Sequence, residues 1–264
     1  MSDPEIFTRL NMLLSEGKPV VLCTLTRKEG SGPRDEGAKM LVEPDGAVFG
    51  TIGGGSMERQ LIDEALKAIS EGKPRKMNFA MGVEPKKGDI VVDSKCGGEV
   101  TIFLDVIKPN PRVIMIGSGH IAKPTAELAA LTGFEVILID DAKSATKARF
   151  PNAEIHSGNF KEALNEVNAY SSDYLVIVHG ETDYELQTLR RFLPDKLAYV
   201  GLLGSKNKAR KHMEQLVSEG FVNADFVRLS GPIGLEIGAE TPEEIAVSIV
   251  AELIEARRSG WPRR

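Results

Sequence analysis

The protein has 264 residues, of which 42% are apolar, and its 33 basic and 38 acidic side chains give a net charge of −5. This length allows a sizeable core in one large domain or two ordinary ones, and we expect two. Because no long run of Lys or Arg concentrates positive charge, we expect no nucleic-acid partner. No apolar run approaches the roughly 20 residues that span a bilayer. Residues 1–5 do not begin a secretion signal, so we expect no membrane association and a cytoplasmic location.

Short strands and two helices are predicted for the first hundred residues. Apolar residues recur at helical spacing over residues 4–15 and 57–70. A polar stretch, 27–37, is expected to interrupt the strands, and residues 44–46 predict a hairpin turn. The predicted strands cover residues 19–26, 38–42, 47–50, 77–80, 89–93 and 100–104. They predict a smaller N-terminal α/β domain with a mixed sheet.

The pattern changes after the two prolines of residues 108–111, where we place the boundary between domain 1–108 and domain 109–264. Strands and helices then alternate, which predicts a Rossmann-like parallel sheet with helices on both faces. The last helix is predicted to begin at Thr241, which caps it, and to end near Arg258. The predicted strands cover residues 113–116, 135–139, 154–156, 174–178 and 197–202.

Two glycine-rich turns, residues 50–56 and 117–122, indicate a chain that holds phosphate-bearing ligands. The second turn joins a buried strand to a helix, as in dinucleotide-binding domains. Asp140 follows at the end of the next strand, where a carboxylate binds ribose hydroxyls and favours NAD over NADP. The alternative is a Rossmann fold that binds no nucleotide. The candidate contacts in this turn are Gly117, Gly119, His120 and Ile121.

Two further loops are expected at the same edge of the parallel sheet. Gly204 and Ser205 begin a helix, where main-chain amides and a hydroxyl bind anions, or where they form an ordinary capped turn. His179 ends a strand and is a candidate ligand contact, or a histidine that hydrogen-bonds locally. Of the two cysteines, Cys23 lies within an apolar strand and is predicted to belong to the core.

Several motifs resemble the XdhC/CoxF family of xanthine dehydrogenase accessory proteins. In the first half they are residues 31–34, residues 37–40, the Gly53–Gly55 triplet with Glu58, and residues 96–98. In the second half they are residues 117–122, 201–205 and 231–246. The likeness spans nearly the whole chain, and the last motif is long and unusual.

This resemblance implies a maturation factor, with no catalytic residue of its own. Such proteins bind molybdenum cofactor, cooperate with a cysteine desulfurase that supplies a sulfido ligand, and deliver the product to an apo-molybdenum hydroxylase. The anionic pterin phosphate suits the guanidinium of Arg34 and the amides of Gly53, Gly54 and Gly55. The resemblance also implies a homodimer.

Cys96 is the candidate metal ligand or sulfur carrier, because a thiolate binds soft metals, and a small buried residue at a turn is the alternative. Many family members have a cysteine directly after the glycine triplet, whereas this chain has Ser56, which is a poor ligand for a soft metal. Ser56 is therefore a candidate cofactor contact or a helix cap.

Two other classes of function compete with the maturation factor. One is an NAD-dependent oxidoreductase, although no acid–base constellation or metal-ligand cluster stands out in the sequence. The other is a regulator that binds NAD without turnover.

Overall fold

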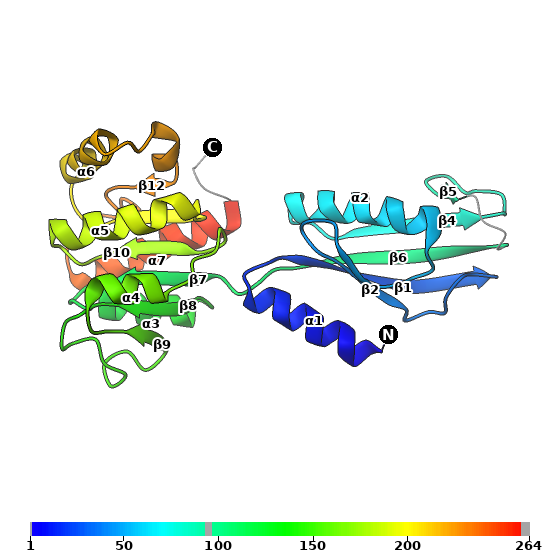
Figure 1. The fold of residues 1–264 in the computed structure, drawn as a ribbon, viewed down its shortest axis with the longest axis horizontal. Helices are drawn as coiled ribbons and strands as arrows, with labels where there is room; N and C mark the ends of the chain where they lie inside the picture. The colour runs from blue at the N-terminus through cyan, green and yellow to red at the C-terminus, as the bar shows by residue number, and fades with distance from the viewer. Residues whose placement is uncertain (1, 93–96, 260–264) are drawn as a thin grey trace. The chain divides into compact units, whose positions relative to one another are not determined.

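The computed structural model describes residues 2–92 and 97–259. The chain divides into two compact units, Met1–Pro109 and Asn110–Arg264, which Figure 1 draws from blue to red along the chain. Among the helices of the described residues, none combines the length and the hydropathy that a membrane span requires.

The first unit is built on one six-stranded mixed sheet. Its strand order is β3-β2-β1-β6-β4-β5, and all neighbours are antiparallel except β4 and β5. The elements are α1 (Asp3–Ser15), β1 (Val20–Gly30), β2 (Lys39–Val42), β3 (Val48–Gly50), α2 (Gly55–Glu71), β4 (Arg75–Met81), β5 (Ile90–Val92) and β6 (Gly98–Ile107). The predicted mixed sheet and both predicted helices are confirmed.

The two helices cover opposite faces of this sheet, because successive side chains of a strand point to opposite sides. Val20 packs in the apolar cluster of α1, whereas Val21 and Cys23 pack in the cluster of α2. Figure 1 shows α1 and α2 on the two sides of β1 and β6. Cys23 is 0% exposed, which confirms that it belongs to the core.

Strand β1 is longer than the sequence predicts, since it continues through residues 27–30 that we expected to lie in a loop. After an irregularity between Leu25 and Arg27, it stays paired with β6 as far as Gly30 and Gly98. A Cβ on Gly98 would lie 2.4 Å from the Glu29 carbonyl oxygen, so β1 and β6 can pair this closely only because residue 98 has no side chain. Main-chain pairing does not require apolar side chains, and it extends the strand into a polar segment.

The second unit is a parallel sheet of six strands in the order β12-β11-β10-β7-β8-β9, which is the Rossmann order. The strands are β7 (Arg112–Ile116), β8 (Glu135–Ile139), β9 (Ala153–His156), β10 (Tyr174–Ile177), β11 (Tyr199–Leu202) and β12 (Leu229–Ser230). The helices are α3 (Ala122–Leu131), α4 (Phe160–Glu166), α5 (Thr182–Phe192), α6 (Lys206–Ser218) and α7 (Pro242–Ser259), with 3-10 turns Leu193–Asp195 and Asn223–Phe226. The predicted fold class is confirmed, and only the two-residue β12 escaped prediction.

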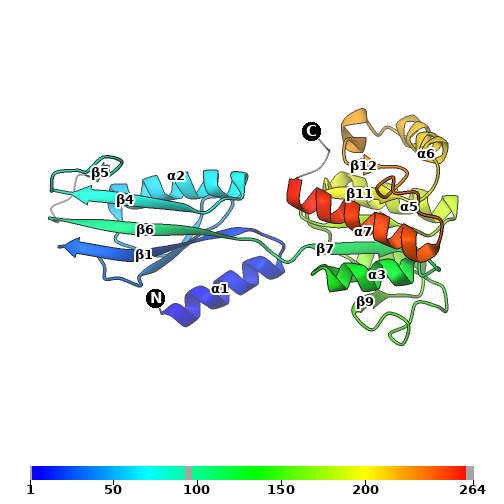
Figure 2. The ribbon, with the colours of Figure 1, turned by 180° about the vertical axis from the view of Figure 1, so that it is seen from behind.

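Apolar clusters on both faces hold this sheet. One cluster joins it to α3 and α7, and the other joins it to α4, α5 and α6. Figure 2 shows α3 and α7 in front of the strands, and Figure 1 shows α4 and α5 in front of them. The predicted cap of α7 is confirmed, because Glu244 N donates to Thr241 Oγ1 and Thr241 N donates to the Glu244 carboxylate.

Candidate functional site

The loops that follow the parallel strands open at one edge of the second unit. Gly117 follows β7, Asp140 follows β8, His179 lies just beyond β10, and Gly204 lies just beyond β11. Strands β7 and β10 are neighbours, and the chain order reverses between them. In open α/β sheets this switch point is where ligands bind.

Gly117 allows the β7 loop and the β10 loop to touch. Its φ is +103°, and a Cβ built on it would lie 2.7 Å from the Cα of His179. Only glycine combines this backbone conformation with so close an approach. Gly119, two residues further, is exposed and has no atom within 4 Å of a Cβ position. The turn therefore has one tightly packed glycine and one open glycine.

Asp140 is enclosed by the glycine turn that precedes it in the chain. Its side chain is 4% exposed, Oδ2 accepts from Ser118 N at 2.5 Å, and Oδ1 accepts from Ala142 N at 3.0 Å. Burial alone would raise the pKa of Asp140, but His179, the Ser118 side chain and the amides of Ala142 and Ser118 lower it to about 2. Main-chain amides thus engage the oxygens that we predicted would bind ribose.

His179 lies against Asp140 and a tyrosine. Its Nε2 is 3.7 Å from Asp140 Oδ1, and this carboxylate raises the pKa of His179 above its ordinary value despite burial. The ring stacks on Tyr184, with centroids 4.1 Å apart and planes 9° apart. Tyr184 in turn donates to Asp141 Oδ2 at 2.7 Å, and this hydrogen bond raises the pKa of Tyr184 to about 12. Asp140, Asp141 and His179 offer ligand atoms within 4.8 Å of one another.

The open side of the turn consists of Gly119, His120 and Ile121. Gly119 and His120 are exposed, and Ile121 is the residue before α3. Within residues 2–92 and 97–259, no hydrogen-bond acceptor is found for the main-chain N–H groups of these three residues. Free amides at the start of a helix are donors suited to a phosphate oxygen.

Ser205 caps α6, because its side chain accepts from Lys208 N at 3.2 Å. Gly204 before it has a φ of +143°. Lys208 does not face a free anion site: its Nζ donates to the buried Glu185 at 2.6 Å, and His212 Nε2 lies 2.9 Å from the other oxygen of Glu185. The capped-turn alternative therefore describes the local structure of this loop, and the assignment of Gly204 and Ser205 to a ligand stays a prediction.

A buried carboxylate also holds the long motif before α7. Glu252 is 2% exposed and accepts from the Tyr199 hydroxyl at 2.7 Å, from Ser230 Oγ at 3.0 Å and from the amide of Gly234. A Cβ on Gly201 would lie 2.2 Å from Ile233, so the motif packs directly on β11. The motif thus attaches the segment before α7 to β11, which the sequence did not indicate.

In the first unit, the glycine triplet is folded around Glu58. Oε1 of Glu58 accepts from the amides of Ile52, Gly53 and Gly54 at 3.1, 3.2 and 2.8 Å, and from Thr51 Oγ1 at 2.6 Å. Burial opposes ionisation, but these hydrogen bonds lower the pKa of Glu58. The amides of Gly53 and Gly54, which we predicted would bind a ligand phosphate, donate to a carboxylate of the protein itself.

Two family-like motifs meet at this triplet. A Cβ on Gly53 would lie 2.3 Å from Pro33, so residues 31–34 pack on the glycine loop. Gly54 and Gly55 have open space where a side chain would stand. Arg34 is exposed, and among the described residues no ion pair is found for it. Ser56 lies in the first turn of α2, whose cap is Gly54, so the alternative that Ser56 caps this helix is wrong, and its contact with a cofactor stays a prediction. Cys96, the candidate metal ligand, lies outside the described residues.

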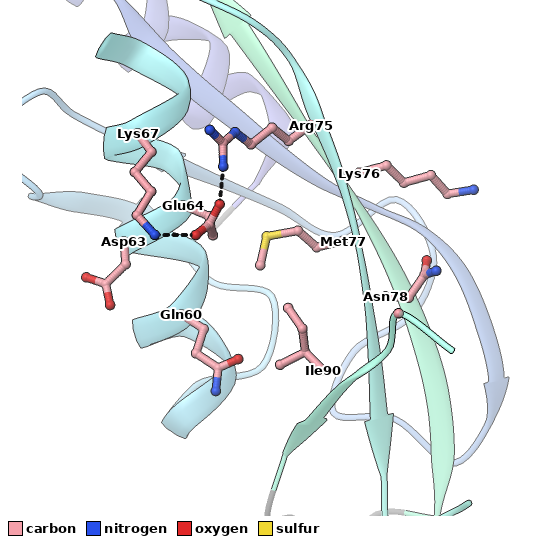
Figure 3. Close-up of a pocket in the computed structure, with 10 residues that line it drawn as sticks. Gln60, Asp63, Glu64, Lys67, Arg75, Lys76, Met77, Asn78 and Ile90 are labelled. Carbon is pink, nitrogen blue, oxygen red and sulfur yellow. Dashed lines mark hydrogen bonds and ion pairs between the residues drawn. The ribbon is translucent and has the colours of Figure 1, made fainter. Parts of the chain in front are cut away.

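A groove of about 710 Å³ lies between α2 and the β4–β5 edge of the first unit (Figure 3). Two of its cations are already paired, because Lys67 and Arg75 both bind Glu64. Met77 and Ile90 add an apolar floor. We assign no ligand to this groove.

The fold and the site define a class: a two-unit α/β protein whose second unit is a Rossmann domain with an open glycine turn. The family model described as XdhC Rossmann domain matches residues 113–253, and the model described as XdhC and CoxI family matches residues 13–80. The chain therefore belongs to the XdhC family, and the resemblance seen in the sequence is confirmed.

Several curated relatives are similar to this chain. A probable xanthine dehydrogenase component of Bacillus subtilis strain 168 is 39% identical over 60% of this chain. The molybdenum cofactor insertion chaperone PaoD of Escherichia coli K12 is 23% identical over 92% of this chain and 85% of PaoD. The chain spans 46% of the Bacillus subtilis relative and 46% of the Escherichia coli K12 protein YqeB, with which it is 34% identical over 96% of its own length. The matched region is thus about half of each of these two relatives.

The crystal structure of a xanthine dehydrogenase from Bacillus halodurans has the same fold. The TM-score is 0.52 at 24% identity, over 98% of this chain and 96% of that one.

Substituting the two glycines of the Rossmann turn should affect the free energy of unfolding to very different extents. Gly117→Ala places a methyl group 2.7 Å from main-chain atoms of His179 and forces alanine to a φ of +103°, so we expect the free energy of unfolding to fall by ~3 kcal/mol or more. Gly119→Ala has open space and serves as the matched control, with little change. Urea unfolding followed by circular dichroism measures both, and equal losses would contradict this account.

Asp140 should make stability depend on pH below 4. A carboxyl whose pKa is lowered by folding stabilises the protein above its unfolded-state pKa and loses that effect as the pH falls through its folded-state pKa. The lowering from 3.8 to about 2 corresponds to ~2 kcal/mol. Asp140→Asn should therefore lower the free energy of unfolding by about this amount at pH 6. The difference from the unsubstituted protein should shrink between pH 4 and pH 2, and a constant difference would refute the assignment.

Proposed function

We propose that this protein binds molybdenum cofactor as cargo and assists its insertion into a molybdenum hydroxylase of the xanthine dehydrogenase type. Membership of the XdhC family carries the proposal, because matches to that family lie in both units. The relative PaoD, a molybdenum cofactor insertion chaperone, aligns with 92% of this chain, and a second relative is a probable xanthine dehydrogenase component.

The glycine loop of the first unit is the proposed cargo site. Bare main chain at Gly54 and Gly55 permits close approach of a flat pterin, and the exposed guanidinium of Arg34 follows Pro33, which packs on the loop. Arg binds phosphate through parallel N–H groups, which suits the cofactor phosphate. Because Glu58 already occupies the amides of Gly53 and Gly54, the phosphate is expected to bind through Arg34.

The proposal extends to sulfur chemistry. Cys96 is the proposed contact for the molybdenum centre or for sulfur delivered by a cysteine desulfurase, since a thiolate is a soft ligand and a nucleophile. Ser56 stands where many family members have a second cysteine, so only one thiol is assigned to this role. We also propose that the protein is located in the cytoplasm and forms a homodimer.

The Rossmann unit is proposed to hold a phosphate at the amides of Gly119 and His120. That phosphate belongs either to the cargo or to a nucleotide such as NAD. Asp140 already accepts from Ser118 N and Ala142 N, and each of its oxygens keeps a second lone pair, so its proposed contact with a ribose hydroxyl would add to these two bonds. The observations favour a carrier over an NAD-dependent oxidoreductase.

Purification from cells that synthesise molybdenum cofactor tests the proposal. We expect the protein to retain pterin and molybdenum, measured as fluorescent oxidised pterin and by elemental mass spectrometry. Arg34→Ala should retain about tenfold less pterin, because one charge-assisted contact contributes ~1.5–3 kcal/mol. Arg27→Ala is the matched control, since this exposed arginine is paired with Glu29.

Reactivation of an apo-hydroxylase tests the delivery step. The loaded protein should accelerate reactivation, and Cys96→Ser should slow it while leaving pterin retention largely intact. Absence of pterin together with unaccelerated reactivation would contradict the proposal. Turnover of NADH with a small substrate would favour the oxidoreductase instead.

A further inference from the structure

The edge of the Rossmann sheet brings together one imidazole and two carboxylates that the proposed carrier function does not use. Asp140 follows β8 directly, Asp141 is the next residue, and His179 comes from the loop after β10. One ligand atom from each lies within 4.8 Å of the others.

His179 lacks a hydrogen bond of ordinary length at either ring nitrogen. Its side chain is only 9% exposed, and Nδ1 is buried without a partner within residues 2–92 and 97–259. Nε2 faces Asp140 Oδ1 at 3.7 Å, which is longer than a hydrogen bond. The nitrogen that faces the Asp140 carboxylate is Nε2 and not the buried Nδ1, and because Nε2 has no hydrogen bond within residues 2–92 and 97–259, its lone pair is available to a metal ion.

The spacing fits a shared cation. Two ligand atoms that each bind one metal ion at ~2.0–2.2 Å lie ~3–4 Å apart, which includes the observed 3.7 Å between Nε2 and Oδ1. A water molecule would satisfy the imidazole but would not offset the negative charge of the two carboxylates. A divalent cation both neutralises them and accepts the imidazole lone pair.

Neighbouring groups already orient all three side chains. Tyr184 stacks on the His179 ring and donates to Asp141 Oδ2, so a single residue positions two of the ligands. The amides of Ser118 and Ala142 fix Asp140. Groups that hydrogen-bond to metal-binding side chains orient those side chains, and removing such a group typically weakens metal binding ~10–100-fold.

We propose that Asp140, Asp141 and His179 bind one divalent first-row transition-metal ion. Two carboxylate oxygens and one imidazole nitrogen suit Mn²⁺, Fe²⁺ or Zn²⁺ better than a soft thiophilic ion. The ion lies next to the Gly117 turn, because Asp140 is bonded to Ser118 N. Its remaining coordination positions are available to water or to an anionic oxygen bound at the free amides of that turn. The site is independent of cargo binding in the first unit.

Titration of the chelator-treated full chain with Mn²⁺ tests this site. Mn²⁺ is the probe because it prefers oxygen and imidazole ligands to thiolates, so that the cysteines do not compete. Isothermal titration calorimetry and electron paramagnetic resonance of free Mn²⁺ should give one ion per chain. Asp141→Asn and His179→Gln should each weaken binding at least tenfold, and Tyr184→Phe, which keeps the ring but loses the bond to Asp141, should weaken it severalfold.

His156→Gln is the matched control, because both nitrogens of His156 are already within 3.0 Å of Glu154 and Glu166. Its Mn²⁺ affinity should equal that of the unsubstituted protein, and circular dichroism should show every variant folded. The proposal is overturned if the unsubstituted chain shows no saturable binding at millimolar Mn²⁺. It is also overturned if folded Asp141→Asn and His179→Gln bind Mn²⁺ as tightly as the control.

Discussion

Carboxylate groups of the protein itself hold its glycine-rich turns, and the candidate sites depend on this interaction. Glu58 accepts from three amides of the turn 50–56, Asp140 accepts from Ser118 in the turn 117–122, and Glu252 accepts from Gly234 in the long motif before α7. The turns contain glycines with a positive φ, and N–H groups of these turns donate to the carboxylates. Without an acceptor, each buried N–H would cost ~1–3 kcal/mol. The carboxylates thus decide which amides remain free for a ligand.

The elements of the fold were largely predictable because each carries its own local pattern. Continuous apolar strands between helical segments indicated the parallel sheet, and Thr241 with Glu244 marked the start of α7. Where a strand forms only because it pairs with a distant segment, the local pattern was not enough to predict it. The last residues of β1 are polar and are a strand only because β6 lies beside them, and β12 is two residues long.

The candidate site was less predictable because its contacts cross between elements. The sequence indicated Gly117, Asp140 and His179, and the structure brings these three together. It did not indicate that Tyr184 links His179 to Asp141, since nothing local relates a helix residue to a strand end 43 residues earlier. Glu58 offered a signal, as an acid in the first turn of a helix behind three glycines, where carboxylates commonly accept from free amides.

Amide hydrogen exchange at Ile52, Gly53 and Gly54 in the ligand-free protein tests most directly whether an internal carboxylate, rather than a ligand, holds a glycine turn. We expect these three amides to exchange slowly in the free protein, and to exchange rapidly in Glu58→Ala while peptides from the second unit are unchanged. Rapid exchange in the free, unsubstituted protein would contradict the account.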